Sequence, residues 1–289
     1  MSDIPLRQYE RHPRDWRQNL YVYPVISRRS GGLSIGVNLN PDMACNFDCI
    51  YCQVDRSKPP PVREVDPDRL RNELAQMIEL ATCGDLFDDS SFADVPPELR
   101  EIKDFAFSGD GEPTTSKRFK ECIELTAEAR LTAGLDGAKI VLITDACYLT
   151  RPAVESGLAI MDENNGQIWA KLDAGTDEYF QKVNRPNYPL QHVVENIIAA
   201  SRGRPVVIQS LFMRIDGEPP TDTELAAYVG RLKEIVGAGG QIDYVQVYTV
   251  ARRPAEESVT ALTKEEVDHI VEMVHQDTGL RVQGYYGPA

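Results

Sequence analysis

The sequence predicts an α/β fold in which helices cover a parallel sheet. Strand-like and helix-like segments alternate from about residue 33 to the carboxyl end and form six strand–helix units. The length of 289 residues suffices for one barrel-sized core, although about 150 residues per domain gives two domains as a soft prior. Polar and glycine-rich clusters follow several strands, where ligands bind in such folds. An open doubly wound sheet and an incompletely closed barrel both satisfy these observations.

Six short apolar segments have the composition of buried strands. Each is rich in β-branched or aromatic residues and is bounded by polar or turn-forming residues, as expected for strands covered on both faces. The predicted strands are 34–39, 104–108, 139–144, 168–173, 205–213 and 244–250.

Helical spacing of apolar residues separates these strands. After residue 66, Asp66 as the cap and Pro67 at the first position predict a helix that Gly84 ends. Leu70 and Leu74 begin its apolar face. The other predicted helices cover 116–131, 153–161, 190–201, 223–236 and 264–275.

The charge balance is acidic. Lys and Arg total 31 against 45 Asp and Glu, which gives a net charge of −14. This balance disfavours nucleic acids and anionic membranes as main partners, because both bind through Lys and Arg. No apolar run approaches the roughly 18 residues of a membrane span. The first seven residues lack a continuous hydrophobic core, so we expect no secretory signal and a cytoplasmic location.

Three of the six cysteines lie close together after the first predicted strand. Cys45, Cys49 and Cys52 fall within eight residues, so one short loop can offer three thiolates to one metal centre. Cys83, Cys122 and Cys147 are scattered. The spacing leaves several alternatives open: buried thiols, a zinc site completed by a distant His, a plain electron-transfer cluster, or a cluster with one iron left for another ligand.

The cysteine spacing, with the aromatic Tyr51 before the third cysteine, resembles the signature of the radical S-adenosylmethionine (radical SAM) superfamily. In that superfamily the three cysteines hold a 4Fe-4S cluster whose unique iron binds the amino and carboxylate groups of S-adenosylmethionine (SAM). The resemblance implies a partial (β/α)6 barrel of the radical SAM type. It also implies Cys45, Cys49 and Cys52 as metal ligands, Tyr51 as a cofactor-binding residue, and both the cluster and SAM as cofactors.

A glycine-rich turn closes the second predicted strand. Its glycines allow the backbone to approach a ligand, and a carboxylate there can pair with an amine. The turn resembles the Gly-Gly-Glu motif that contacts the amino group of SAM, with Gly111 and Glu112 as the matching residues. Asp110 stands where many members have Gly, which leaves its own role open. A tight turn with a solvated acid is the alternative interpretation.

Polar residues on three later strands are further cofactor-binding candidates. Strand alternation places Lys171 and Asp173 on one face. There they can bind a ribose or a carboxylate of the cofactor, or they can form a structural ion pair with each other. Gln209 interrupts an apolar strand and needs partners, either the cofactor or a neighbouring strand. Tyr248 lies where the superfamily's last strand approaches adenine.

The resemblance implies an enzyme that cleaves SAM reductively to a 5′-deoxyadenosyl radical, which abstracts hydrogen from a small-molecule or protein substrate. An electron donor such as flavodoxin or ferredoxin is the expected partner, and no membrane is. The catalytic residues toward the substrate are not assigned. Residues 1–32 are expected to form an extension that packs on the barrel, and 33–289 the core barrel with a C-terminal helix and tail.

Two alternatives remain at this point. The sequence around the cysteines resembles that of a branch of iron–sulfur oxidoreductases. This branch includes wyosine-base synthases, which act on transfer RNA. RNA recognition needs phosphate contacts, which fit an acidic chain poorly unless Arg28, Arg29, Arg252 and Arg253 form a local exception. The second alternative is a non-enzymatic metal or electron-transfer protein.

Overall fold

The computed structural model describes residues 8, 16–57, 59–252, 254 and 256–287. The chain divides into two compact units. The first unit consists of Met1–Ala44, Arg56–Ile143 and Pro152–Gln167, and the second of Cys45–Asp55, Thr144–Arg151 and Ile168–Ala289. The cysteine segment therefore belongs to the second unit, although the first unit precedes and follows it in sequence.

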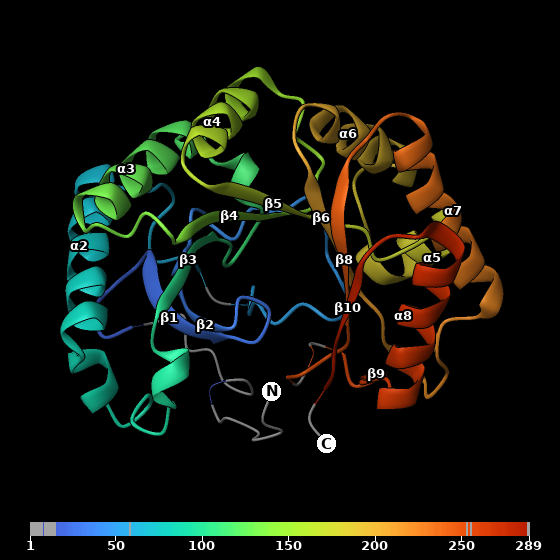
Figure 1. The fold of residues 1–289 in the computed structure, drawn as a ribbon, viewed down its shortest axis with the longest axis horizontal. Coiled ribbons are helices and arrows are strands. Elements are labelled where there is room, and N and C mark those ends of the chain that lie inside the picture. Colours follow the sequence, from blue (N-terminus) through green and yellow to red (C-terminus); the bar gives the residue numbers. More distant parts are fainter. Residues whose placement is uncertain (1–7, 9–15, 58, 253, 255, 288–289) are drawn as a thin grey trace. The chain divides into compact units, whose positions relative to one another are not determined.

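The first unit contains a sheet in the order β1-β2-β3-β4. Its strands are β1 (Val22–Ser27), β2 (Gly32–Val37), β3 (Ile102–Phe107) and β4 (Lys139–Thr144). Strand β1 pairs antiparallel with β2, and the other pairs are parallel. Helices α2 (Pro67–Cys83), α3 (Phe119–Thr132) and α4 (Pro152–Glu163) lie side by side along the outside of these strands (Figure 1).

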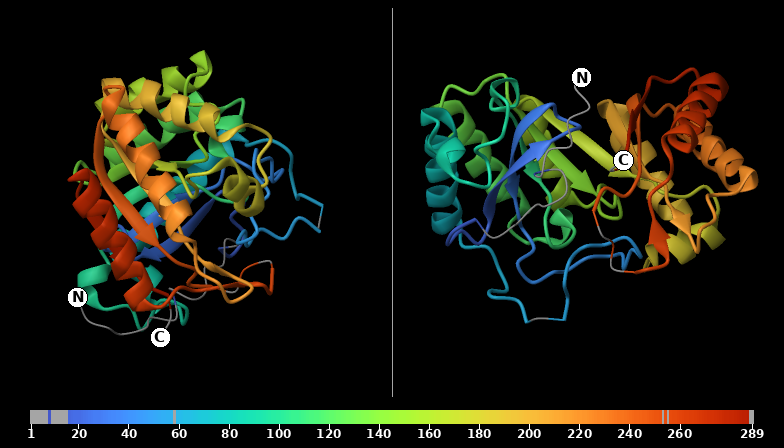
Figure 2. Two further views of the ribbon diagram at one scale, coloured as in Figure 1. Left: turned by 90° about the vertical axis from the view of Figure 1, so that its right-hand side faces the viewer. Right: turned by 90° about the horizontal axis from the view of Figure 1, so that it is seen from below.

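The second unit has parallel strands in the order β5-β6-β8-β10. These are β5 (Gly166–Lys171), β6 (Val206–Leu211), β8 (Ile242–Tyr248) and β10 (Val282–Tyr285). Helices α6 (Leu190–Gly203), α7 (Asp222–Gly237) and α8 (Lys264–Thr278) follow one another beside them, as Figure 2 shows from two further sides. A short antiparallel pair joins β7 (Arg214–Ile215) to β9 (Val259–Thr260), and α5 (Asp177–Asn184) follows β5.

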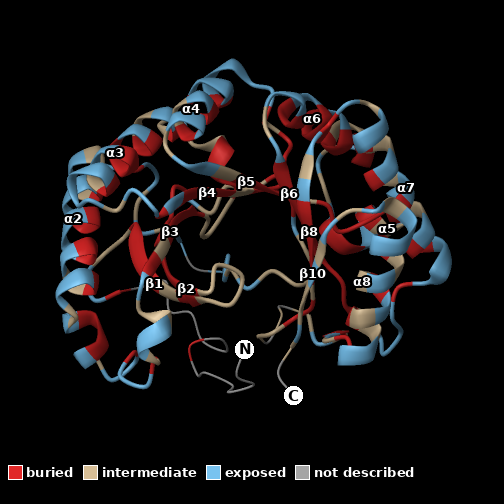
Figure 3. Cartoon of the chain, in the orientation of Figure 1, coloured by how far each residue is buried: buried red, intermediate tan, exposed pale blue. Residues whose placement is uncertain are grey.

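The strands form the buried layer of each unit. Every residue of β2 and of β6 is buried, which agrees with their mainly apolar sequences. The helices turn exposed faces outward and buried faces toward the strands (Figure 3). No helix in the described ranges is long and apolar enough to cross a membrane.

The six predicted strands and six predicted helices are all present, with ends that differ by a few residues. The predicted start and end of α2 are confirmed: the Asp66 carboxylate accepts hydrogen bonds from two backbone N–H groups, and Gly84 is left-handed with φ 96°. The sequence-based prediction missed α5, β1 and β10 and the two-residue strands β7 and β9. The division at residue 32 stays a prediction, because 1–7 and 9–15 lie outside the described residues, as does Arg253.

Candidate functional site

The cysteine segment is fixed to the end of helix α5 by backbone hydrogen bonds. The N–H of Asp48 donates to the carbonyl of Asn184 at 3.0 Å, and the N–H of Ile50 donates to the carbonyl of Val183 at 3.0 Å. Beyond the helix, the N–H of Asn187 donates to the carbonyl of Asn46 at 3.1 Å. Three residues of the loop at 45–52 are thus hydrogen-bonded to 183–187, and these bonds fix the backbone on both sides of Cys49.

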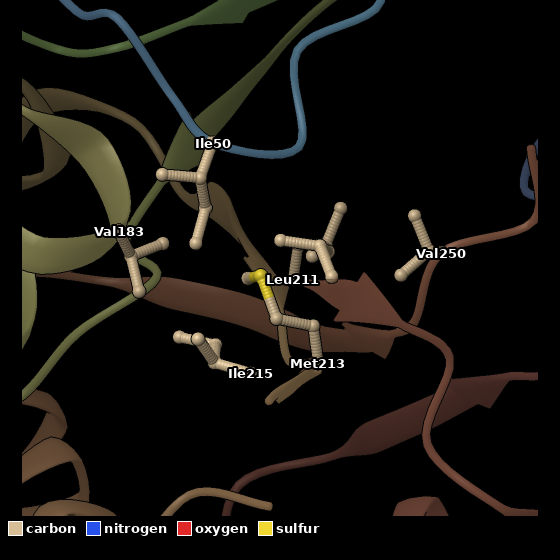
Figure 4. Packing of buried hydrophobic residues seen from close by; sticks show 7 residues of the cluster. Ile50, Val183, Leu211, Met213, Ile215 and Val250 are labelled. Carbon is tan, nitrogen blue, oxygen red and sulfur yellow. The ribbon is translucent and has the colours of Figure 1, made fainter. Parts of the chain in front are cut away.

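The cysteine loop also contributes a side chain, Ile50, to a buried hydrophobic cluster. Ile50 is 3% exposed and packs with Val183, which is fully buried. Both side chains point into the cluster (Figure 4). Its members are Ile50, Val183, Leu211, Met213, Ile215, Val250 and Val259. Burial of one such aliphatic side chain contributes about 1.5–3 kcal/mol, so Ile50 anchors the loop between two of the cysteines.

The three thiols of the loop are partly exposed, and none of the six cysteines forms a disulfide. Burial raises the pKa of the Cys49 thiol to about 11. Among the residues that the structure describes, no three His, Cys, Asp or Glu side chains gather closely enough to hold a metal ion. The structure therefore places Cys45, Cys49 and Cys52 on one anchored loop, without bringing the three sulfurs to one point.

Asp173 is the centre of a buried polar network beside the loop. Its Oδ1 accepts a hydrogen bond from the N–H of Leu211 at 2.8 Å. Its Oδ2 accepts hydrogen bonds from the hydroxyl of Tyr51 and from Nδ2 of Asn184, the latter at 2.9 Å. Both carboxylate oxygens are thus engaged, and they join the cysteine loop to β6 and α5. Burial, followed by the charge of Asp173, raises the pKa of Tyr51 well above its ordinary value.

Lys171 forms the predicted pair with Asp173. Its Nζ lies 3.3 Å from Oδ2 of Asp173 and donates a hydrogen bond to the hydroxyl of Tyr248 at 3.1 Å. The ammonium also lies 5.1 Å from the ring centre of Tyr51, within the range of a cation–π contact. Burial lowers the pKa of Lys171, but the opposite charge of Asp173 more than offsets this effect and raises it overall. Lys171 is therefore held as a cation.

Gln209 extends this network across two strands. It is 1% exposed. Its Nε2 donates to Oε1 of Gln246 on β8 at 3.2 Å, and its Oε1 accepts a hydrogen bond from the hydroxyl of Tyr248 at 3.5 Å. The buried amide of Gln209 thus has a hydrogen-bond partner on a neighbouring strand, as one of the two interpretations predicted. The network brings together four predicted residues, Lys171, Asp173, Gln209 and Tyr248, with Tyr51 of the cysteine loop.

The glycine-rich turn lies in the first unit. The N–H of Glu112 donates to the carbonyl of Ala44 at 2.8 Å, and Ala44 immediately precedes Cys45. A Cβ on Gly111 would lie 2.1 Å from that carbonyl oxygen, so only glycine allows this close approach. The buried Glu112 carboxylate accepts hydrogen bonds from the N–H and hydroxyl of Thr114, at 3.0 and 2.6 Å.

The position of Asp110 also has a structural account. Its carboxylate accepts a hydrogen bond from Nδ2 of Asn38 at 2.6 Å. Oδ1 of Asn38 in turn accepts a hydrogen bond from the backbone N–H of Asp110 at 3.2 Å. These two bonds tie the turn after β3 to the residue that follows β2. Asp110 therefore shapes the turn whose neighbours are Gly111 and Glu112.

Asn184 is the site residue that sequence reasoning missed. It is fully buried, and its Nδ2 lies 3.4 Å from Sγ of Cys49 and 3.3 Å from the hydroxyl of Tyr51. It ends α5, a helix of eight residues whose cap Thr176 accepts a hydrogen bond from the N–H of Tyr179. Thr176 followed by Asp177 and Glu178 is a helix-start signal that the sequence does contain. Nothing in the sequence connects that helix to the cysteines.

A family model described as the radical SAM superfamily matches residues 40–216. The match includes the cysteine loop, the glycine-rich turn and the polar network except Gln246 and Tyr248, and it covers more than half of the 289 residues. The chain belongs to the radical SAM superfamily. Members of this superfamily are enzymes that use a 4Fe-4S cluster and SAM and act by radical chemistry.

Solved radical SAM structures share the fold. A radical SAM methyltransferase from Sphaerobacter thermophilus has a TM-score of 0.62 at 13% identity over 93% of this chain and 70% of its own. The structure of TYW1 with a lysine-pyruvate adduct bound has a TM-score of 0.53 at 14% identity over 86% of this chain and 74% of its own. The predicted fold class, a partial barrel of the radical SAM type, is confirmed.

Curated relatives are longer than this chain. A protein named GTPase Obg from Brachyspira hyodysenteriae is 24% identical over 85% of this chain but only 32% of its own length. A UPF0026 protein from Methanocaldococcus jannaschii is 27% identical over 61% of this chain and 48% of its own length. The chain thus spans from about a third to half of the length of these two relatives.

The residues at the cysteine loop suit the cofactors of the radical SAM superfamily. Three thiols on one loop are the donor set expected for a cluster that leaves one iron for a further ligand. Oδ1 of Asn184 is buried beside the loop and has no hydrogen-bond partner within the described residues. A buried acceptor without a donor is rare in proteins, and it fits a site that completes its polar contacts with a bound group.

Proposed function

We propose that this chain is a radical SAM enzyme that binds one 4Fe-4S cluster through Cys45, Cys49 and Cys52 and cleaves SAM. When bound, the cluster supplies the electron that cleaves SAM to methionine and a 5′-deoxyadenosyl radical, which abstracts hydrogen from the substrate. The observation that carries this proposal is the anchored three-cysteine loop inside the family-matched range. A reductant such as flavodoxin or ferredoxin and a cytoplasmic location are parts of the same proposal.

Within this proposal, the chain's own residues bind and orient the cofactor. Gly111 offers backbone that a ligand can approach, and Glu112 offers a buried carboxylate for an amine. Lys171 is a buried cation suited to a carboxylate, and Tyr248 and Gln209 fix its position. Tyr51 and Asp173 hold the loop against β5 and β6. Apolar walls such as the Ile50 cluster exclude water from a reactive radical.

The substrate proposed is a small molecule or a protein. The net charge of −14 disfavours RNA, whose affinity depends on Lys and Arg neutralising phosphates. The similarity to TYW1 concerns the fold, and the alternative of a transfer-RNA substrate is tested by direct binding. Tight binding of transfer RNA at physiological salt, falling steeply as salt rises, would overturn the preference for a non-nucleic-acid substrate.

Turnover of SAM tests the central proposal. Anaerobically reconstituted protein with dithionite is expected to convert SAM to 5′-deoxyadenosine, and Cys49→Ala is expected to abolish this turnover and lower the iron content. Cys83→Ala is the matched control, because Cys83 is exposed at the end of α2 and should leave both values unchanged. Equal turnover by wild type and Cys49→Ala contradicts the proposal. A cluster that forms but never binds SAM points instead to an electron-transfer protein.

A further inference from the structure

The side-chain amide of Asn184 has an orientation that its surroundings determine. Nζ of Lys171 lies 3.3 Å from Oδ2 of Asp173, and the carboxylate of such an ion pair only accepts hydrogen bonds. The atom of Asn184 that lies 2.9 Å from Oδ2 of Asp173 must therefore be the donor Nδ2. The same nitrogen carries a second hydrogen, and Sγ of Cys49 lies 3.4 Å away. Asp173 thus directs an N–H donor at the sulfur.

We infer that Asn184 is a positioning residue for the cluster-binding loop and that its amide is the hydrogen-bond donor to the Cys49 sulfur in the reduced and oxidised enzyme. This inference rests on the proposed function. Asn184 neither gives nor takes a proton or an electron: the electron passes from the reductant to the cluster, and the amide acts through its hydrogen bond to the sulfur.

The expected consequence is a higher reduction potential. Hydrogen bonds to ligand sulfurs are among the features that set the potential of an iron–sulfur cluster. A donor stabilises the more negative, reduced state more than the oxidised one, so its presence favours reduction. A difference of about 1.4 kcal/mol between the two states corresponds to a tenfold change in the reduction equilibrium.

The side chain and the backbone of Asn184 have separable roles. The backbone carbonyl accepts the hydrogen bond from the N–H of Asp48, and every substitution except proline retains that carbonyl. The neighbouring Val183 carbonyl likewise holds Ile50. Replacement of the amide alone therefore leaves the loop attached to α5. The remaining effect reports the contacts of Nδ2 with Cys49, Tyr51 and Asp173.

The test compares Asn184→Leu with wild type and with Asn196→Leu. Leucine branches at Cγ as asparagine does, but it has no hydrogen-bond donor. Asn196 is also buried in the second unit, where its Nδ2 donates to the carbonyls of Ala146 and Cys147 at 3.0 and 2.8 Å, so its loss controls for the removal of a buried amide. The measurements are iron per chain after reconstitution, the midpoint potential by an anaerobic redox titration followed by electron paramagnetic resonance, and thermal unfolding of the protein without iron.

We expect Asn184→Leu to shift the midpoint potential to more negative values, with a reduction equilibrium about tenfold less favourable, or about 59 mV for one electron. Asn196→Leu should keep the wild-type potential. Loss of the cluster by Asn184→Leu, in a chain that still unfolds like Asn196→Leu, also supports the positioning role. If Asn184→Leu does not fold, Asn184→Ser, which is shorter and cannot reach the sulfur, takes its place.

An unchanged potential and an unchanged iron content in both Asn184 variants would overturn the inference. That outcome leaves the proposed function intact, because the wild type would still bind the cluster and cleave SAM. Failure of the wild type to bind a cluster would instead reject the proposed function, so the two failures are distinguishable.

Discussion

The ammonium of Lys171 lies 3.3 Å from Oδ2 of Asp173, whose side chain is completely buried. Asp173→Asn keeps the shape of the side chain but removes the charge, which leaves the Lys171 cation without its partner. We expect a loss of about 3–5 kcal/mol in the free energy of unfolding, because removing one member of a buried pair strands the other charge. Chemical denaturation at neutral pH measures this loss.

The double variant Lys171→Met/Asp173→Asn separates the pair from its surroundings. Removal of both charges relieves the stranded ammonium, so the double variant should be more stable than Asp173→Asn alone. Losses that simply add would show that the two side chains act independently, contrary to the observed contact.

Gly111→Ala tests the close approach of the glycine-rich turn to Ala44. The new Cβ would lie 2.1 Å from a backbone oxygen, so the backbone must shift. We expect a loss of about 1–3 kcal/mol and weaker SAM binding, measured by denaturation and by cofactor titration. Gly137→Ala is the control, because no heavy atom lies within 4 Å of its added Cβ. Equal effects of the two substitutions would contradict a specific approach.

Gly175→Ala tests whether α5 controls the cysteine loop. A Cβ there would lie 2.0 Å from the backbone nitrogen of Tyr228, and Gly175 immediately precedes Thr176, the cap of α5. Displacement of α5 should lower the iron content after reconstitution as well as the stability. Gly230→Ala, at a glycine inside α7 with open space around it, should instead stabilise the chain by up to about 1 kcal/mol. Wild-type iron content in Gly175→Ala would count against the proposed control by α5.

Asp104→Asn tests a pH effect in the first unit. Burial raises the pKa of Asp104 above 3.8, although its carboxylate accepts a hydrogen bond from the hydroxyl of Ser34. Between the ordinary pKa of 3.8 in the unfolded chain and the raised pKa in the folded chain, the native state binds more protons than the unfolded state. The contribution of protonated Asp104 to stability is therefore lost as pH rises from the first pKa through the second.

The asparagine variant lacks this loss. Its free energy of unfolding relative to wild type should therefore increase from pH 4 upward and level off once Asp104 is ionised in the native state. Denaturation curves of both proteins at several pH values measure the difference, which removes the contribution of all other titrating groups. Parallel curves for the two proteins would show that Asp104 keeps its ordinary pKa in the folded chain.

The sequence predicted the repeating units of the fold because those elements bury long apolar faces or runs. Helix α5 was missed because its eight residues are mainly polar or charged, and short helices depend on tertiary packing. Strand β10 was missed because it has only four residues, none of them buried. Pro24 interrupts the strand pattern of β1, which lies at the edge of its sheet.

For the candidate site, local spacing made the three cysteines candidate ligands, and strand alternation placed Lys171 and Asp173 on one face, where they do form an ion pair. The contacts that organise them are not local. Tyr51 reaches Asp173 across 122 residues, and Asn184 reaches Cys49 across 135. A single sequence carries no signal for either contact, since each joins segments that lie far apart in the chain.

The separation between Cys49 and Asn184 also bears on the order of events during protein synthesis. At about 5–20 residues per second, the 135 residues that separate them require roughly 7–27 s of translation. Throughout that interval the nascent chain carries three thiols whose backbone anchors at 183, 184 and 187 do not yet exist. Cluster insertion into the supported loop therefore follows the emergence of α5 from the ribosome, and the thiols are most open to oxidation before it.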